Sequence, residues 1–200
     1  MTDPITVHVG TQLEIFFQFL VDEVQLLTPS GAPTGGTVDA GHRGKVAPLI
    51  RFDSTALDMQ EALCQLPNVG PNGVICWGGP WPTAGISVKF IGHMVGKRNH
   101  PPITITNNLT GGTFPNITVT TPQPGGLIEP STVTGFIAPK DGASVALTVD
   151  PQGGQGVWKA NYTPTVEGLH TARAVGASPV FGTVEAEQVF TAVPRVVASV

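Results

Sequence analysis

Apolar residues recur with helical spacing in only one clear stretch of the chain, residues 54–67. Four of them fall at i, i+3, i+4 and i+7 and so share one face: Met59, Ala62, Leu63 and Leu66. Ser54 and Thr55 offer side-chain oxygens to the unpaired N–H groups of a first turn. Pro67 disfavours helical geometry at the preceding residue and should end the run. The pattern predicts a short helix that needs a sheet to cover its apolar face.

Alternation of period two marks the remaining elements, and residues 11–21 show it best. The residues expected on one face are Leu13, Ile15, Phe17, Phe19 and Val21. The other face is only half polar, because Phe16 and Leu20 share it with Glu14 and Gln18, so we expect a largely buried strand. Further short strands are predicted at 24–27, 46–52, 74–77, 86–91, 103–106 and 117–120. Residues 29–37 read as a turn-rich hairpin region, and residues 107–113 read as a loop.

A boundary is predicted at residues 121–126, Thr-Pro-Gln-Pro-Gly-Gly. Five short strands follow at close spacing, at 132–137, 144–149, 157–162, 169–175 and 184–192. Such spacing suggests a β-sandwich, although five strands make an incomplete one.

Composition fits a folded, loop-rich and mostly β chain. The 200 residues include 25 glycines and 19 prolines, and 40% are hydrophobic, which is ample for a core. The net charge of −4 argues against a nucleic-acid or membrane-surface role, since both need a basic face. The sequence has no run of 18 apolar residues and no charged-then-apolar amino terminus, so we expect neither a membrane span nor Sec export.

The sequence offers no set of residues that predicts catalysis, a cofactor or a metal. Nucleophile-elbow, phosphate-loop, His-Glu-x-x-His and Cys-x-x-Cys motifs are missing. Five histidines are scattered along the chain: His8, His42, His93, His100 and His170. Asp39, Asp53 and Asp58 lack the alternating spacing of calcium loops. Cys64 and Cys76 could form a disulfide between helix and sheet, but two buried thiols are the interpretation we favour for a protein made in a reducing cytosol.

Three features are candidates for an interface. Trp77 and Trp81 flank a Gly/Pro turn, where they could anchor a partner or cap their own core. Lys97 and Arg98 form the one basic loop, which could meet an acidic neighbour. The last eight residues are unusually apolar for a chain end and include Val196, Val197 and Val200. We expect this tail to pack on a neighbouring subunit, or else to lengthen the final strand of its own domain.

Residues 23–124 resemble a β-rich module of actinobacteriophage virion proteins and of some large bacterial surface proteins. The motifs that carry the resemblance are residues 33–37 (Pro-Thr-Gly-Gly-Thr), 55–63, 66–70, 78–80, 86–92 and 109–113. Two departures occur: Trp77 and Trp81 stand where the module usually has small residues, and residues 39–45 interrupt an expected strand.

The two ends of the chain together resemble the small immunoglobulin-like (Ig-like) proteins of tailed phages. The resemblance begins at residues 9–19 and resumes at 130–133, 156–164, 168–173 and 185–190. About a hundred residues intervene where such proteins have a few. The resemblance therefore implies an Ig-like β-sandwich made of residues 1–22 and 125–200, with residues 23–124 inserted in one loop as a small α+β module containing one helix.

The function that these resemblances imply is structural and non-enzymatic. We expect a tailed-phage virion protein, assembled in the bacterial host cytoplasm, that decorates the capsid or serves as a head–tail accessory. Its expected partners are other virion proteins, major capsid or tail and connector subunits, and further copies of itself. The alternative is a tail-associated or surface module that binds a host-surface glycan. A bacterial adhesin fragment is a weaker third reading, and a hydrolase is the least favoured.

Overall fold

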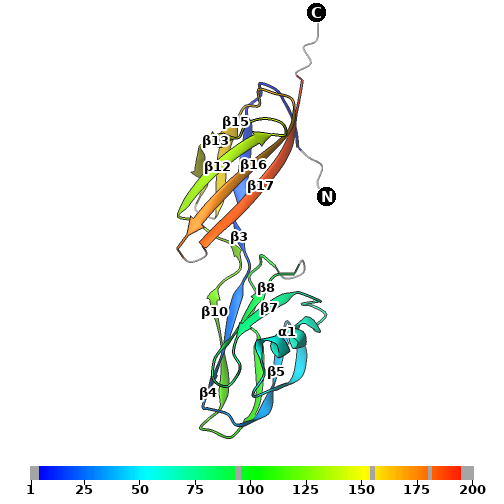
Figure 1. The fold of residues 1–200 in the computed structure, drawn as a ribbon, viewed down its shortest axis with the longest axis vertical. Coiled ribbons are helices and arrows are strands. Elements are labelled where there is room, and N and C mark those ends of the chain that lie inside the picture. Colours follow the sequence, from blue (N-terminus) through cyan, green and yellow to red (C-terminus); the bar gives the residue numbers. More distant parts are fainter. Residues whose placement is uncertain (1–4, 93–95, 154–155, 180–181, 195–200) are drawn as a thin grey trace, which may run out of the picture. The chain divides into compact units, whose positions relative to one another are not determined.

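The computed structural model describes residues 5–92, 96–153, 156–179 and 182–194. The described chain is mostly β with one helix, as the sequence pattern predicted. It folds into two compact units (Figure 1): residues 1–20 with 127–200 form unit 1, and residues 21–126 form unit 2. The tail candidates Val196, Val197 and Val200 lie outside the described residues.

Unit 1 contains two β-sheets. The five-stranded sheet has the order β1-β17-β16-β12-β13, and the three-stranded sheet has the order β14-β15-β2. β1 runs parallel to β17, and the other described pairings in these sheets are antiparallel. The strands are β1 (Ile5–His8), β2 (Leu13–Gln18), β12 (Thr132–Pro139), β13 (Val145–Leu147), β14 (Val149–Pro151), β15 (Val157–Tyr162), β16 (Gly168–Ser178) and β17 (Gly182–Val193).

The strand β2 belongs with strands from the far end of the sequence. It pairs with β15 from Leu13 opposite Tyr162 to Gln18 opposite Val157, which confirms that the predicted strand joins the C-terminal part of the chain. The strand is shorter than residues 11–21: β2 ends at Gln18, although the Phe19 N–H still bonds the Gly156 carbonyl, and Leu20 and Val21 form a separate short strand. Its second face is exposed at Glu14, Phe16 and Gln18, so the prediction of a largely buried strand was wrong for that face.

The two sheets of unit 1 pack face to face. The Tyr162 ring of β15 lies 5.7 Å from His170 of β16 and 6.2 Å from Phe190 of β17, measured between ring centroids. A side chain at Gly135 would place its Cβ 2.3 Å from Val149, so this close approach of β12 and β14 requires glycine. The predicted strand 144–149 is divided: the chain leaves one sheet after β13 and enters the other at β14.

Unit 2 has a four-stranded sheet, a three-stranded sheet and the helix α1 (Ala56–Cys64) around one core. The orders are β10-β4-β8-β7 and β6-β5-β9. The strands are β4 (Val24–Ser30), β5 (Gly35–His42), β6 (Lys45–Arg51), β7 (Val74–Gly78), β8 (Ile86–Phe90), β9 (Thr104–Thr110) and β10 (Asn116–Gln123). Two short strands, β3 (Leu20–Val21) and β11 (Gly126–Leu127), pair where the chain passes between the units.

The helix presents the predicted apolar face to this core. Met59 and Leu63 are fully buried, and Leu66 is buried just beyond the last turn. Thr55 caps the first turn, as expected for a residue with a side-chain oxygen. The element is shorter than residues 54–67 because Gln65 is its C-cap and the chain then turns, with the N–H of Leu66 bonded to the Leu63 carbonyl.

Two regions of unit 2 predicted as turns are strands. β5 begins inside the predicted hairpin region 29–37 and continues through the supposed interruption at 39–45, with the turn confined to Arg43 and Gly44. β5 is hydrogen-bonded on both sides and buries Val38 and Ala40, so tertiary pairing overrides its glycine-rich local sequence. β9 likewise extends into the predicted loop by pairing with β5.

Candidate functional site

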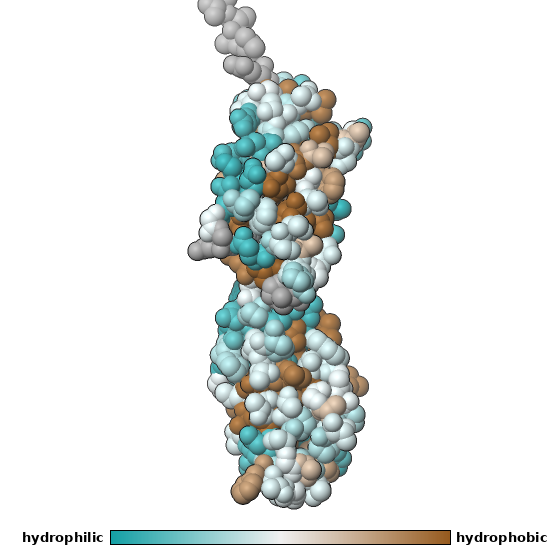
Figure 2. Space-filling view, turned by 90° about the vertical axis from the view of Figure 1, so that its left-hand side faces the viewer, coloured by the Kyte–Doolittle hydropathy of each residue, from teal (hydrophilic) through white to brown (hydrophobic). Residues whose placement is uncertain are grey.

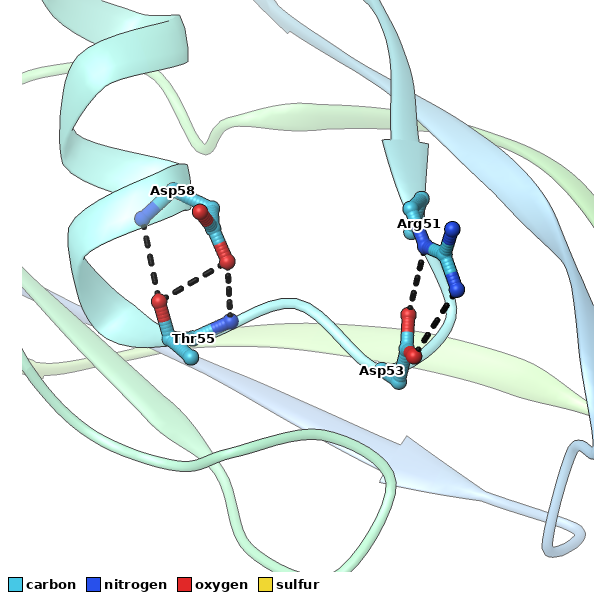
Figure 3. Close-up of polar contacts among 4 residues, drawn as sticks. All are labelled: Arg51, Asp53, Thr55 and Asp58. Atoms are coloured by element: carbon cyan, nitrogen blue, oxygen red, sulfur yellow. Dashed lines mark hydrogen bonds and ion pairs between the residues drawn. The ribbon is translucent and has the colours of Figure 1, made fainter.

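The first candidate site lies where β6 leads into α1 (Figure 3). The Arg51 side chain donates two parallel hydrogen bonds to Asp53, from Nε to Oδ1 at 2.9 Å and from Nη2 to Oδ2 at 3.0 Å. Thr55 and Asp58 cap each other: the Asp58 backbone N–H donates to Thr55 Oγ1 at 3.2 Å, and the Thr55 backbone N–H donates to Asp58 Oδ2 at 2.8 Å. These contacts fix the entry into the helix.

Both carboxylates at this site already have strong partners. The Arg51 guanidinium lowers the pKa of Asp53, and hydrogen bonds from the backbone N–H and hydroxyl of Thr55 lower the pKa of Asp58. Asp39 accepts from the backbone N–H of Leu49 at 3.0 Å instead of joining them. Within the described ranges, no three His, Cys, Asp or Glu side chains are placed to hold a metal ion.

A shallow hollow of about 460 Å³, the α1 groove, opens beside this helix entry. Apolar atoms of Ala47, Ile50 and Ala62 contribute to its lining. The charged or amide side chains that line it are Arg51, Asp53, Asp58, Glu61 and Gln65. Neither histidine nor cysteine lines the groove, so it contains no imidazole or thiol for acid–base or nucleophilic chemistry. The groove can hold a polar segment against a mainly acidic rim.

The two tryptophans of the predicted turn have different environments. Trp81 is 2% exposed and belongs to the unit 2 core, with its backbone N–H bonded to the Ser54 carbonyl at 3.0 Å. This corrects its assignment as an interface residue: the large side chain fills the core of its own unit. Trp77 is 45% exposed on β7, two residues from Ile75, which is 46% exposed. Since i and i+2 residues of a strand share a face, these two form an apolar pair at the surface.

Lys97 and Arg98 are exposed, but their loop is tied to unit 2. The Lys97 backbone N–H donates to Asp22 Oδ1 at 2.8 Å, and Lys89 Nζ of β8 lies 3.6 Å from Asp22 Oδ2. Lys89 stands opposite Ile75 of β7 in the sheet register.

A buried polar cluster in unit 2 escaped the sequence interpretation. Glu23, Gln25, His42 and His100 are all at most 5% exposed. Glu23 accepts from the His100 backbone N–H and from Gln25 Nε2, each at 2.6 Å. Gln25 Oε1 accepts from the Ile103 backbone N–H at 2.7 Å. The sequence prediction placed Gln25 on a strand at 24–27 but left Glu23 outside it, and no local pattern indicated the partners of either residue.

Unit 1 carries a second hollow of about 470 Å³, between the loop after β12 and the loop after β15. Val145, Val166 and Leu169 line it and are 53%, 48% and 39% exposed. Tyr162 also lines it. Figure 2 shows hydrophobic residues reaching the surface of each unit. No local sequence pattern indicated this hollow, because its walls come from loops and strand ends that only the fold brings together.

The two cysteines are free thiols in unit 2, as the favoured interpretation held, but both are half-buried and not fully buried. Cys64 Sγ of α1 lies 3.9 Å from the Val74 carbonyl oxygen of β7. Burial, and to a smaller extent the nearby Cys64, raises the pKa of Cys76 to about 12, which keeps that thiol protonated and unreactive at neutral pH.

Comparison of the sequence with protein-family models and with curated proteins yields no match. In the described part of the chain, no helix has the length and apolar character needed to cross a membrane.

Proposed function

We propose that the chain is a non-enzymatic structural protein of a tailed-phage virion, acting as a capsid decoration or head–tail accessory protein. The observation that carries the proposal is the strand order of unit 1. If β2, β14 and β15 are labelled B, D and E, the three-stranded sheet has the order D-E-B. If β12, β16 and β17 are labelled C, F and G, the other sheet contains G-F-C. Immunoglobulin-type sandwiches divide their strands in this way.

The position of unit 2 supports the same proposal. Its residues 21–126 lie between β2 and β12, the strands labelled B and C. The Ile128 backbone N–H donates to the Phe19 carbonyl at 2.9 Å, so the chain leaves and re-enters unit 1 at adjacent points. A loop insertion with neighbouring ends leaves the host sandwich intact. The strand β1 pairs with β17 and not with β2, which departs from the A-B-E-D order of constant-type immunoglobulin sandwiches.

A tail-associated or surface module that binds a host glycan is the second candidate. The exposed Trp77 and Ile75 on β7 favour it, because an exposed tryptophan face can stack on the apolar face of a sugar ring.

Quantitative mass spectrometry of purified virions of the encoding phage tests both candidates. Hundreds of copies per particle are expected for a capsid decoration or tail-tube protein, and a handful for a connector or tail-tip protein. Absence from the purified virion contradicts both placements.

A further inference from the structure

Two buried histidines in unit 2 face each other at hydrogen-bond distance. His42, at the end of β5, is fully buried, and His100, in the segment before β9, is 5% exposed. Nε2 of His42 lies 3.2 Å from Nδ1 of His100. The Phe90 ring of β8 stacks on His100, with 4.4 Å between centroids and 15° between planes. The contact therefore joins three elements of one core.

The neighbouring groups determine which ring nitrogens carry protons. Arg43 Nη2 lies 3.5 Å from His100 Nδ1, and a guanidinium can only donate, so His100 Nδ1 is the acceptor. His42 Nε2 must then be the donor, which leaves its Nδ1 as an acceptor. Asn68 Nδ2 lies 3.4 Å from that Nδ1 and is oriented by its 2.6 Å bond to the His42 carbonyl.

This arrangement requires Nδ1 of His42 to keep its lone pair, because Nε2 of His42 already carries the proton that is donated to His100. A proton added to His42 Nδ1 would meet the Asn68 N–H, which sets donor against donor in a buried site, where the cost is high.

The surrounding charges give the added proton little support. Arg43 and Lys45, the register partner of His42, are cationic. Glu23 accepts a hydrogen bond from the backbone N–H of His100.

We propose that the His42–His100 contact is an acid-sensitive latch: it holds residues 96–103 on unit 2 near neutral pH, and acidification releases them while the rest of the unit stays folded. Release would free the loop that carries Lys97 and Arg98 and uncover the Phe90 ring. The pH therefore controls which residues of unit 2 are exposed at its surface.

The direction of the pH effect and the pH range in which it occurs follow from the difference in proton binding between the closed and open forms. Burial, together with His100 and Arg43, lowers the pKa of His42 from 6.5 to about 4. The open form therefore binds a proton below pH 6.5, whereas the closed form does so only near pH 4. The latch has its full stability above pH 6.5 and loses it as the pH falls toward 4. If His42 regains its ordinary pKa on opening, the open population rises about 30-fold between pH 7.5 and pH 5.

Amide hydrogen exchange of the full chain, corrected for intrinsic rates, measures this opening. The expected result is a fall of about 30-fold in the protection of the His100 and Ile103 amides from pH 7.5 to pH 5. The β8 amides should change far less. Unchanged protection at His100 and Ile103 would overturn the latch, and so would an equal loss across β8 and α1, which would indicate general unfolding of unit 2.

Two variants assign the effect to the histidine pair. His42→Gln keeps a donor but cannot titrate, so its exchange at residues 96–103 should no longer depend on pH in this range. A persisting acid response would show that His42 is not the group that senses pH and would contradict the proposal. His170→Gln is the matched control, since His170 is fully buried in unit 1 and stacks on Phe190 with 5.1 Å between centroids. It should leave the response of residues 96–103 intact.

If His42→Gln does not fold, a measurement on the wild-type protein still tests whether His42 is protonated only at low pH. An NMR titration of the His42 ring should give a pKa below 5, and a value near 6.5 in the closed form would refute the latch.

Discussion

Lys159 Nζ lies 3.0 Å from Glu14 Oε1, although 145 residues separate the two positions in the sequence. The contact spans the paired strands β15 and β2. Both side chains are partly exposed, so the ion pair itself contributes little stability. Its significance is topological: unit 1 is built from both ends of the chain, and all of unit 2 lies between them.

Unit 1 should therefore fold without unit 2. Replacing residues 23–124 by a short Gly/Ser linker should leave a cooperatively unfolding protein, because Phe19 and Ile128 are already hydrogen-bonded neighbours. Trp158 is the one tryptophan that remains, so its fluorescence reports unfolding directly. A shortened chain with no cooperative transition would show that unit 1 depends on the insert.

Leu63 is the position at which unit 2 should be most sensitive to truncation. The side chain is fully buried in the core beneath α1, and Leu63→Ala should lower the free energy of unfolding of unit 2 by about 2–5 kcal/mol. Leu57→Ala is the matched control on the same helix, since Leu57 is 60% exposed, and should change stability by less than about 0.5 kcal/mol. Hydrogen exchange resolved by unit makes the measurement. Equal loss of protection in unit 1 would mean that the units do not unfold separately.

The cap of α1 should contribute a smaller and separable amount. Thr55→Ala removes the acceptor for the Asp58 backbone N–H and should cost unit 2 about 1 kcal/mol. Thr55→Ser keeps the hydroxyl and should recover most of that loss. Chemical denaturation of both variants checks this, and equal stabilities for alanine and serine would contradict the capping role.

Substitution of Trp81 should destabilise unit 2 far more than substitution of Trp77. Trp81→Ala should cost about 3–5 kcal/mol, because it opens a cavity in the unit 2 core. Trp77→Ala should cost much less, since the side chain is 45% exposed. If Trp77 contacts a partner, its substitution should instead reduce incorporation into the virion or binding to a glycan array. A folded Trp77→Ala variant that behaves as wild type in both assays would exclude Trp77 from the interface.

The sequence by itself determined those features that depend on local periodicity. The stripe containing Met59 and Leu63 predicted the helix and its buried face, because residues at i and i+4 share one side of a helix wherever it docks. Alternation predicted that Ile15 and Phe17 point into a core. The resemblance to Ig-like proteins, rather than periodicity, predicted that this strand would pair across the length of the chain.

Only the tertiary structure decided the features that depend on contacts between distant segments. β5 has the composition of a turn and is a central strand because β6 and β9 pair with it on both sides. Trp77 and Trp81 share one local sequence, yet only Trp81 is buried, since the core that receives it comes from α1 and both sheets. His42 and His100 lie 58 residues apart and look unremarkable alone. Their meeting depends on how β5, β8 and the segment before β9 pack together, and no local pattern encodes that.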